Sequence, residues 1–284
     1  MTENAIELVN ITKTFGDVVA NDCVNLTVKK GEILALLGEN GSGKTTLVNM
    51  LSGIYFPDSG EIFVNGERAV IRSPIDAFSY GIGMVHQHLK LVDVFTAAEN
   101  VVLGLKGGVC IDRKKLAVKI REIAEKYGFE IDPKKKIYDM AISEKQTVEI
   151  IKVLYRGANI LILDEPTAVL TPQETEKFFD VLRKMKEDGK SIIIITHKLN
   201  EVLAISDRVA ILRKGRSVGV VETRTATAQS LTEAMVGRSV SLSIERPEVP
   251  PTGDRLTVQE LNCVDHEGVR VLKDVSFVLH GGEI

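Results

Sequence analysis

A glycine-rich segment, Gly38 to Thr45, constrains the fold of this chain more strongly than any other feature of its sequence. Its letters are GENGSGKT, which fit the pattern G-x-x-x-x-G-K-[ST]. The apolar run Glu32 to Leu37 precedes the segment, and a run with helical spacing, Thr45 to Leu51, follows it. Glycine, lysine and threonine all fall at their required offsets, so a glycine-rich turn without a ligand is the weaker interpretation. The segment predicts an α/β fold with a phosphate-binding loop.

The loop offers several groups to a nucleoside triphosphate. Consecutive backbone N–H groups and the partial positive charge of the following helix would surround the phosphates. Lys44 is expected to bridge the β and γ phosphates, and the Thr45 hydroxyl is expected to ligate Mg²⁺. The residues expected to bind the nucleotide in this loop are Gly38, Asn40, Gly41, Ser42, Gly43, Lys44, Thr45 and Thr46.

The composition is that of an ordinary globular protein. Of 284 residues, 44% are hydrophobic and 26% are charged, and the net charge of −3 gives no basic field that would make nucleic acid an expected partner. No stretch approaches the roughly 18 consecutive apolar residues of a membrane span, and residues 1–4 show no signal-peptide pattern. Cys23, Cys110 and Cys263 share no metal-ligand spacing and are expected to be free thiols in a reducing cytoplasm.

Periodicity predicts the layout of the rest of the chain. Short apolar runs bounded by turn residues predict buried parallel strands, alternation predicts antiparallel strands, and 3.6-residue spacing predicts helices. The expected fold class is α/β, with a mixed sheet and flanking helices, an antiparallel β subdomain, and an inserted helical subdomain over about 95–156. The segments concerned are 5–35 and 60–71 (antiparallel strands), 159–163 and 191–196 (parallel strands), and 113–127, 144–156 and 172–187 (helices).

The C-terminal part of the chain repeats the pattern of the N-terminal part. Leu256 to Leu261 is similar to Ile6 to Ile11, and Val271 to Ile284 is similar to Ala20 to Ile33, with a shared Gly-Glu-Ile ending. A coincidental hairpin is the weaker interpretation, because both the ending and the alternation match. The expected organisation is a nucleotide-binding domain over 1–240, a proline-rich linker over 241–254, and the start of a second, truncated copy over 255–284.

Two adjacent carboxylates, Asp164 and Glu165, follow the apolar run Ile160 to Leu163. A buried strand that ends in aspartate places a carboxylate at the sheet edge where the Mg²⁺ of a bound nucleotide would lie. Glu165 is then expected to polarise the attacking water. Two neighbouring carboxylates would repel each other without a cation, which favours a functional site over a surface pair.

Three further side chains are candidate site residues, although the sequence supports them less strongly. His197, after the second buried run, is interpreted as a donor to the γ phosphate, although a lone histidine there is more often a core residue. Gln87 could reach both Mg²⁺ and water. Its neighbours His86 and His88 are not expected to bind a metal, because no third ligand is evident nearby. Phe15 could stack on adenine, but a core aromatic is nearly as good an interpretation of its spacing.

In this order and spacing, the motifs resemble those of the ATP-binding-cassette (ABC) ATPase family over about residues 5–240, and again over 255–284. The resemblance implies a Walker A loop at GENGSGKT, a Walker B strand, a Q-loop and a switch histidine. It implies hydrolysis of ATP with Mg²⁺ as cofactor. The residues implied are Glu165, His197, Gln87 and Lys44 for catalysis, Thr45, Gln87 and Asp164 for the metal, and Phe15 for adenine.

Finer features resemble the tandem ATPases of importers for nucleosides and simple sugars. They are IRSPIDAFSYGIGMVHQHLKLVDVFTAAENVVLG (71–104) and YRGANILILDEPTAVLTPQE (155–174), together with the tandem design and its short linker. The resemblance implies that the protein docks on two membrane permeases at the cytoplasmic face of the cell membrane, through residues 88–104. It also implies an extracytoplasmic substrate-binding lipoprotein as an indirect partner, and the second nucleotide-binding half as a direct one.

The chain departs from the family at the signature LSGGQ, where it has Met140 to Glu144 (MAISE), and Thr171 stands where the D-loop aspartate is expected. In this family each ATP lies between the Walker motifs of one half and the signature of the other. We therefore expect one consensus and one degenerate site in the full protein, with the Walker residues of this chain in the competent site. The isolated chain is expected to bind nucleotide but to hydrolyse it weakly.

Two other classes of protein share parts of this pattern. A soluble tandem ABC ATPase acting on ribosomes would usually carry a long charged helical linker and a basic surface, and a DNA-repair ATPase would carry coiled coil between its Walker motifs. The sequence shows neither. A nucleotide-sensing module with little turnover is a further alternative, which the degenerate signature favours and the intact Glu165 and His197 disfavour.

Overall fold

The computed structural model of the chain describes residues 3–105, 112–239, 252–265 and 268–282. The chain divides into two compact units, Met1–Val240 and Ser241–Ile284. Within the described residues, the first unit contains a six-stranded sheet in the order β10-β9-β3-β8-β7-β6. Its strands are parallel except for β10, which pairs antiparallel at one edge. They are β3 (Ile33–Leu37), β6 (Ile82–Val85), β7 (Ile160–Asp164), β8 (Ser191–Ile195), β9 (Arg208–Arg213) and β10 (Arg216–Glu222).

The central strands of this sheet are apolar along their whole length because both faces are covered. All five residues of β3 and of β8 are buried, as expected for parallel strands that lie between layers. A second sheet, antiparallel in the order β2-β1-β4-β5, packs its apolar face into the same core as α1. Its strands are β1 (Asn4–Phe15), β2 (Val18–Lys29), β4 (Ser59–Val64) and β5 (Glu67–Ala69).

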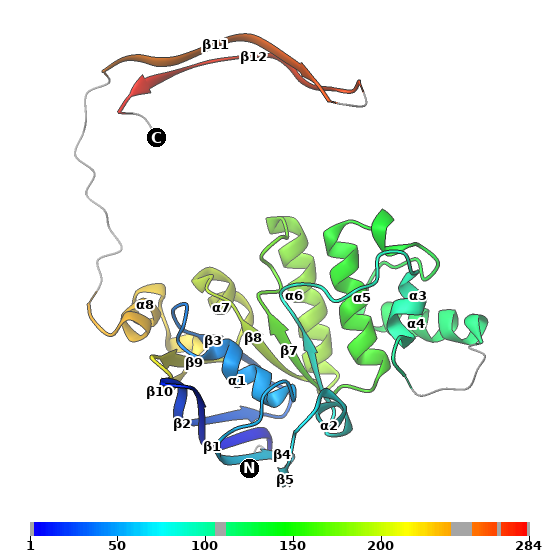
Figure 1. Cartoon of the computed structure of the whole chain (residues 1–284), viewed down its shortest axis with the longest axis vertical. Coiled ribbons are helices and arrows are strands. Elements are labelled where there is room, and N and C mark those ends of the chain that lie inside the picture. The colour runs from blue at the N-terminus through cyan, green and yellow to red at the C-terminus, as the bar shows by residue number, and fades with distance from the viewer. Residues whose placement is uncertain (1–2, 106–111, 240–251, 266–267, 283–284) are drawn as a thin grey trace. The chain divides into compact units, whose positions relative to one another are not determined.

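The helices fall into two groups. Helices α3, α4 and α5 share a small core of their own, which includes Ala97, Ile120 and Val148, and Figure 1 shows them together at one end of the unit. The others flank the sheet. The helices are α1 (Lys44–Leu51), α2 (Pro74–Ser79), α3 (Ala97–Val102), α4 (Arg113–Tyr127), α5 (Ile142–Tyr155), α6 (Pro172–Glu187), α7 (Leu199–Ile205) and α8 (Ala228–Val236), with 3₁₀ turns at Ile137–Asp139 and Thr223–Thr225.

The predicted fold class is confirmed in each of its parts: an α/β core with a mixed sheet, an antiparallel sheet, and an inserted group of helices. Most predicted elements differ from the observed ones by one or two residues at their ends. The antiparallel strands predicted over 60–71 turn at Asn65 and Gly66, with φ of 52° and 86°, the positive values that a two-residue type I′ turn requires.

The second unit is an antiparallel hairpin of β11 (Thr252–Val264) and β12 (Arg270–Gly281). Its register repeats that of β1 and β2. The pair Leu256↔Leu279 corresponds to Ile6↔Val28, and Leu261↔Val275 corresponds to Ile11↔Val24. Non-glycine residues with positive φ also recur at corresponding positions, which are Asn10 and Cys23 in the first hairpin and Glu260 and Asp274 in the second.

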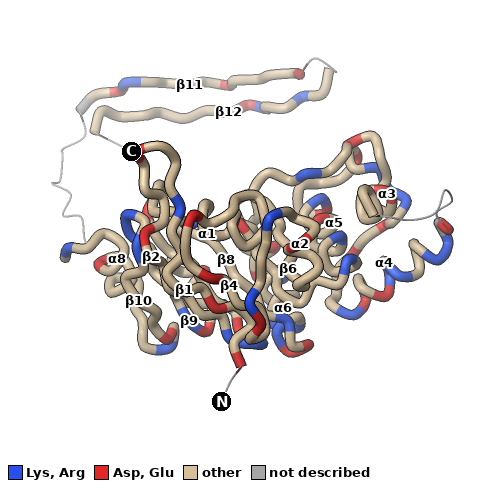
Figure 2. Tube along the Cα trace, turned by 60° about the horizontal axis from the view of Figure 1, so that its bottom comes forward, with Lys and Arg blue, Asp and Glu red and all other residues tan. Residues whose placement is uncertain are grey.

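Several sequence expectations concern parts of the chain that the structure does not describe. Residues 241–251 of the expected linker and Cys110 lie outside the described residues. Residues 252–254 of that linker belong to β11. Cys23 and Cys263 are free thiols. No helix in the described ranges is long and apolar enough to cross a membrane, and Figure 2 shows acidic and basic residues interspersed along the chain.

Candidate nucleotide-binding and hydrolysis site

The glycine loop connects the end of β3 to the start of α1, as the sequence predicts. Gly43 caps the helix in the left-handed conformation, with φ of 97°. A Cβ atom added there would lie 2.3 Å from the Ala20 carbonyl oxygen, and one added at Gly38 would lie 2.4 Å from the Leu212 carbonyl oxygen. Both positions therefore require glycine, because the loop passes too close to neighbouring backbone for any side chain.

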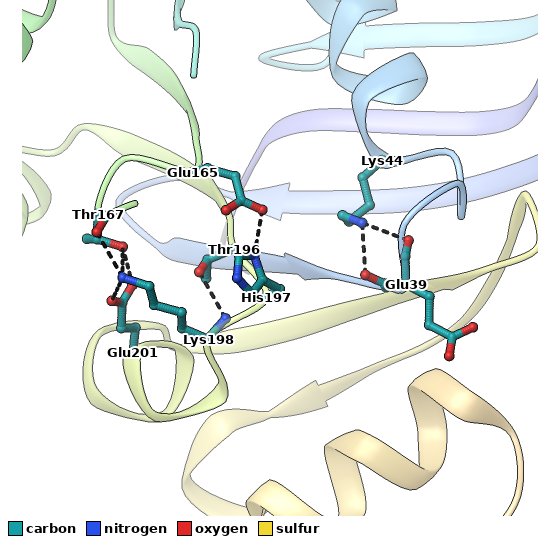
Figure 3. Close-up of polar contacts among 9 residues, drawn as sticks. Glu39, Lys44, Glu165, Thr167, Thr196, His197, Lys198 and Glu201 are labelled. Carbon is teal, nitrogen blue, oxygen red and sulfur yellow. Dashed lines mark hydrogen bonds and ion pairs between the residues drawn. The ribbon is translucent and has the colours of Figure 1, made fainter. Parts of the chain in front are cut away.

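The Lys44 ammonium is held inside this loop. Its Nζ donates to the carbonyl oxygens of Gly38, at 2.8 Å, and Glu39, at 3.0 Å (Figure 3). The residue is only 8% exposed. Burial lowers the pKa of the Lys44 ammonium, and the nearby carboxylates of Glu165 and Asp164 oppose that shift. Within the described part of the chain, the hydrogen-bond partners of this charged group are the two neutral carbonyl oxygens. An anion would be a better partner for it than these carbonyls.

A cavity of about 790 Å³ opens over the loop. It gathers residues from β2, the glycine loop, the ends of β6, β7 and β8, and α8. Every site residue predicted from the sequence contributes to it except Phe15. The lining residues are Val18, Val19, Ala20, Gly38, Glu39, Asn40, Gly41, Ser42, Gly43, Lys44, Thr45, Thr46, Gln87, Asp164, Glu165, Ile195, His197 and Met235.

Asp164 is the last residue of β7, and Glu165 begins the turn that follows. Burial raises the pKa of the Asp164 carboxyl, the charge of Glu165 adds to the rise, and Lys44 opposes it. Glu165 has φ of 49°, a left-handed conformation that costs a non-glycine residue roughly 1–3 kcal/mol. Its backbone N–H donates to the Ile195 carbonyl oxygen at 2.8 Å, so the turn is fixed against the end of β8.

His197 lies two residues beyond the end of β8 and faces Glu165. Its Nδ1 is 2.9 Å from Glu165 Oε1 (Figure 3). Gln87 lies two residues beyond β6 and lines the same cavity. Since β6, β7 and β8 are parallel neighbours, their carboxyl ends bring Gln87, Asp164, Glu165 and His197 to one edge of the sheet.

Phe15 lies at the end of β1, is 42% exposed, and does not line the cavity. Its ring packs edge-on against Tyr55, with centroids 5.1 Å apart, and the Lys13 ammonium is 5.5 Å from its centroid. Two residues were not predicted from the sequence: Tyr55 as a neighbour of Phe15, and Met235 of α8 as a lining residue of the cavity. Neither belongs to a motif, so only the folded arrangement shows them.

The segment Met140 to Glu144, expected at the signature position, leads into the start of α5. Glu144 turns back and accepts the Ala141 backbone N–H at 2.8 Å, and it pairs with Lys135 at 2.7 Å. Ser143 and Glu144 line a second cavity of about 290 Å³ between α5 and α6. Thr171, at the D-loop position, caps the N-terminus of α6. Glu144 and Thr171 thus take part in helix capping.

The donor set near the loop suits a magnesium ion bound together with a phosphate group. Nowhere in the described ranges do three or more His, Cys, Asp or Glu residues form a group that could hold a metal ion by themselves. Mg²⁺ rarely uses such a cage: it takes one or two protein oxygens and completes its shell with phosphate and water. The partly buried Asp164 carboxyl and Thr45, which line the same cavity, fit that requirement.

The match to a protein family agrees with this geometry. The family described as "ABC transporter" matches residues 22–168. The chain therefore belongs to the ABC transporter ATPase family. It is 48% identical to the nucleoside import ATP-binding protein NupA of Lactococcus lactis, over 99% of this chain and 56% of that protein. It is 47% identical to the guanosine import ATP-binding protein NupO of Bacillus subtilis, over the same shares.

Solved structures show the same fold. The ADP conformation of MJ1267, an ATP-binding cassette of an ABC transporter, matches with a TM-score of 0.74 at 24% identity, over 84% of this chain and 100% of that chain. The dimeric structure of MJ0796, a bacterial ABC transporter cassette, matches with a TM-score of 0.68 at 28% identity, over 78% of this chain and 100% of that chain. The chain spans about half the length of the curated relatives it matches.

Proposed function

We propose that this chain is the ATP-binding and ATP-hydrolysing part of an importer for a nucleoside or a simple sugar. One observation carries the hydrolytic part of the proposal: a single cavity holds the glycine loop, Asp164 and Glu165, with His197 2.9 Å from the Glu165 carboxylate. The relatives named for nucleoside import and guanosine import support the cargo class. Their names favour an importer over a ribosomal ATPase or a nucleotide-sensing module.

The phosphates of ATP would bind over the glycine loop. Lys44 would exchange its two carbonyl partners for phosphate oxygens, and the first N–H groups of α1 would donate to the same anion. Ser42 Oγ is buried and has no hydrogen-bond partner among the residues that the structure describes, as expected of a loop whose polar groups are completed by a ligand. Phe15, with Tyr55 against its edge, would meet the adenine ring at the outer end of the site.

Thr45, Asp164 and Gln87 would hold Mg²⁺, which when bound neutralises charge on the β and γ phosphates. Glu165 would accept a hydrogen bond from the attacking water and orient it for in-line displacement at the γ phosphorus. His197 would hold the Glu165 carboxylate from one side and donate to the γ phosphate as charge develops. Lys44 would stabilise the same charge.

An import ATPase must drive membrane permeases. The chain would bind such permeases at the cytoplasmic face of the membrane. The segment 88–104, which follows Gln87, would form the contact. A substrate-binding lipoprotein outside the membrane would be an indirect partner. The second nucleotide-binding half would begin with the hairpin of β11 and β12, since its register repeats that of β1 and β2.

The altered signature at Met140 to Glu144 would make one of the two ATP sites of the full protein degenerate. Ala141 stands where the family has the serine, and Ile142 and Ser143 stand where it has the glycines, that hold the γ phosphate of the opposing half. The site built on the glycine loop of this chain relies on the other half's signature instead. That site would therefore be the competent one.

The substitution Glu165→Gln in the full-length protein with its permeases tests the assignment. It removes the carboxylate that orients water and leaves the loop intact, so ATP hydrolysis and transport should fall about 100-fold or more while ATP affinity is retained. Glu67→Gln, at an exposed carboxylate of β5, is the matched control and should leave both unchanged. Survival of hydrolysis and transport in Glu165→Gln would contradict the proposal.

A further inference from the structure

The turn that carries Glu165 is held by three successive backbone groups. The Glu165 N–H donates to the Ile195 carbonyl oxygen at 2.8 Å. The Pro166 carbonyl oxygen accepts from Gln146 Nε2 of α5 at 2.5 Å. The Thr167 carbonyl oxygen accepts from Lys198 Nζ at 2.8 Å. Each contact comes from a different element, so the turn is fixed from several sides.

The contact with Lys198 belongs to a closed network (Figure 3). Lys198 Nζ also pairs with Glu201 Oε1 at 2.9 Å, and the Thr167 hydroxyl donates to Glu201 Oε2. The Lys198 backbone N–H donates to Thr196 Oγ1 at 3.1 Å. Thr167 is 1% exposed. We refer to Thr167, Lys198 and Glu201 together as the brace.

The brace joins the two turns that carry the hydrolytic pair. Thr167 stands two residues after Glu165, and Lys198 directly follows His197. Glu201, in the first turn of α7, binds both. If the two turns moved relative to each other, the 2.9 Å distance between Glu165 Oε1 and His197 Nδ1 would change. The hydrogen bonds of the brace oppose such a movement.

A fixed turn matters here because of the backbone conformation of Glu165. Its φ of 49° is rare for a residue with a side chain and persists only where surrounding contacts determine it. Without the brace, the turn could relax toward an ordinary conformation. That would swing the carboxylate away from the water it orients and from His197.

We infer that Thr167, Lys198 and Glu201 are positioning residues for ATP hydrolysis, which hold the Glu165 carboxylate and the His197 ring in register. The inference rests on the proposed function, since it assumes that Glu165 and His197 act on ATP. None of its three residues lines the cavity over the glycine loop, and none is among the residues that contact the Phe15 ring. Its loss should therefore slow turnover and spare ATP binding.

Three substitutions test this in the full-length protein with its permeases. Thr167→Val keeps the shape of the side chain and removes the hydroxyl, whereas Thr167→Ser keeps the hydroxyl. Lys198→Met removes the ammonium at nearly constant length. We expect kcat for ATP hydrolysis to fall about 10- to 100-fold in Thr167→Val and Lys198→Met, with the Kd of a fluorescent ATP analogue within about twofold of the parent value. Thr167→Ser should retain most of the activity.

Arg68→Met, which breaks an exposed ion pair with Glu61, is the control and should leave kcat unchanged. An unchanged kcat in Thr167→Val and Lys198→Met would overturn the inference. So would a parallel loss of ATP affinity, or a Thr167→Ser variant as impaired as Thr167→Val, because either would indicate a general structural role.

Hydrogen exchange of the nucleotide-free chain gives a second readout that needs no turnover. The amide of Glu165 should exchange about tenfold or more faster in Thr167→Val than in the parent or in Arg68→Met, as the turn opens more often. Unchanged exchange over residues 164–168 would overturn the inference. If the unmodified full-length complex does not hydrolyse ATP, the proposed function fails, and the exchange experiment still decides whether the brace holds the turn.

Discussion

At the scale of the residue, Lys44 occupies a position that serves binding at the expense of stability. Its ammonium is buried in the glycine loop with two carbonyl oxygens as hydrogen-bond partners. Because burial lowers the pKa of this group, its charged form is less favourable in the folded chain than in the unfolded chain. Below its ordinary pKa the protonated group therefore reduces the free energy of unfolding. Residues held in this way are typical of binding sites.

The substitution Lys44→Met separates the two effects. It should weaken ATP binding about 100-fold or more, because the charge that neutralises the phosphates is lost. It should also raise the melting temperature of the nucleotide-free chain by roughly 2–4 °C, equivalent to about 1 kcal/mol in a unit of this size. Thermal unfolding with and without ATP measures both. A marked fall in melting temperature without nucleotide would contradict the argument.

At the scale of the element, the helices around the site begin in different ways. Helix α1 starts from Gly43 with no side-chain cap, which leaves its first N–H groups available to an anion. Helix α6 starts with a complete capping box: Thr171 Oγ1 accepts from the Glu174 N–H at 3.3 Å, and Glu174 Oε2 accepts from the Thr171 N–H at 2.9 Å. A capped terminus serves stability, whereas the uncapped one is suited to a ligand.

The cap of α6 predicts the effect of two substitutions at one position. Thr171→Ala removes the capping oxygen and should lower the free energy of unfolding by about 1 kcal/mol. Thr171→Asp restores the residue type expected at the D-loop and is itself a good N-cap, so it should be near neutral for stability. Urea denaturation of the chain measures both. Equal destabilisation by the two variants would contradict the capping role.

At the scale of the whole molecule, the two hairpins have the same register but different surroundings. Ile6 and Val28 are fully buried in the first unit, whereas their counterparts Leu256 and Leu279 are 48% and 39% exposed in the second. Exposed apolar faces of this kind are costly in water. Within the described residues, the second hairpin therefore has the register of the first but not its buried apolar face.

This organisation predicts slow turnover by the isolated chain. If each ATP site needs the signature of a second half, residues 1–284 as a monomer should bind ATP but hydrolyse it at least tenfold more slowly than the full-length protein. The reason is that in such a composite site the glycine loop and Glu165 would supply only one side. Light scattering to establish the monomer, followed by a phosphate-release assay, makes the comparison. Rapid hydrolysis by a demonstrated monomer would contradict it.

Motif spacing predicted most of the site because its residues stand at strand ends. Asp164 and His197 follow the strands predicted over 159–163 and 191–196, and the parallel pairing of β6, β7 and β8 in the fold brings both, with Gln87, to one edge of the sheet. Helix ends were predictable for a similar reason, since Pro172 can begin a helix and Gly189 can follow one at no steric cost. These are local properties of the chain.

Contacts between distant segments could not be predicted in this way. Tyr55 against Phe15, Met235 at the cavity, and Glu201 between Thr167 and Lys198 depend on how separate elements pack. The sequence by itself determined the α/β core, the glycine loop and the carboxylates at the strand end, because glycine conformation, apolar periodicity and motif offsets act over a few residues. Only the tertiary structure decided which side chains hold the hydrolytic turn, because those contacts form when residues far apart in the chain are brought together by the packing of the core.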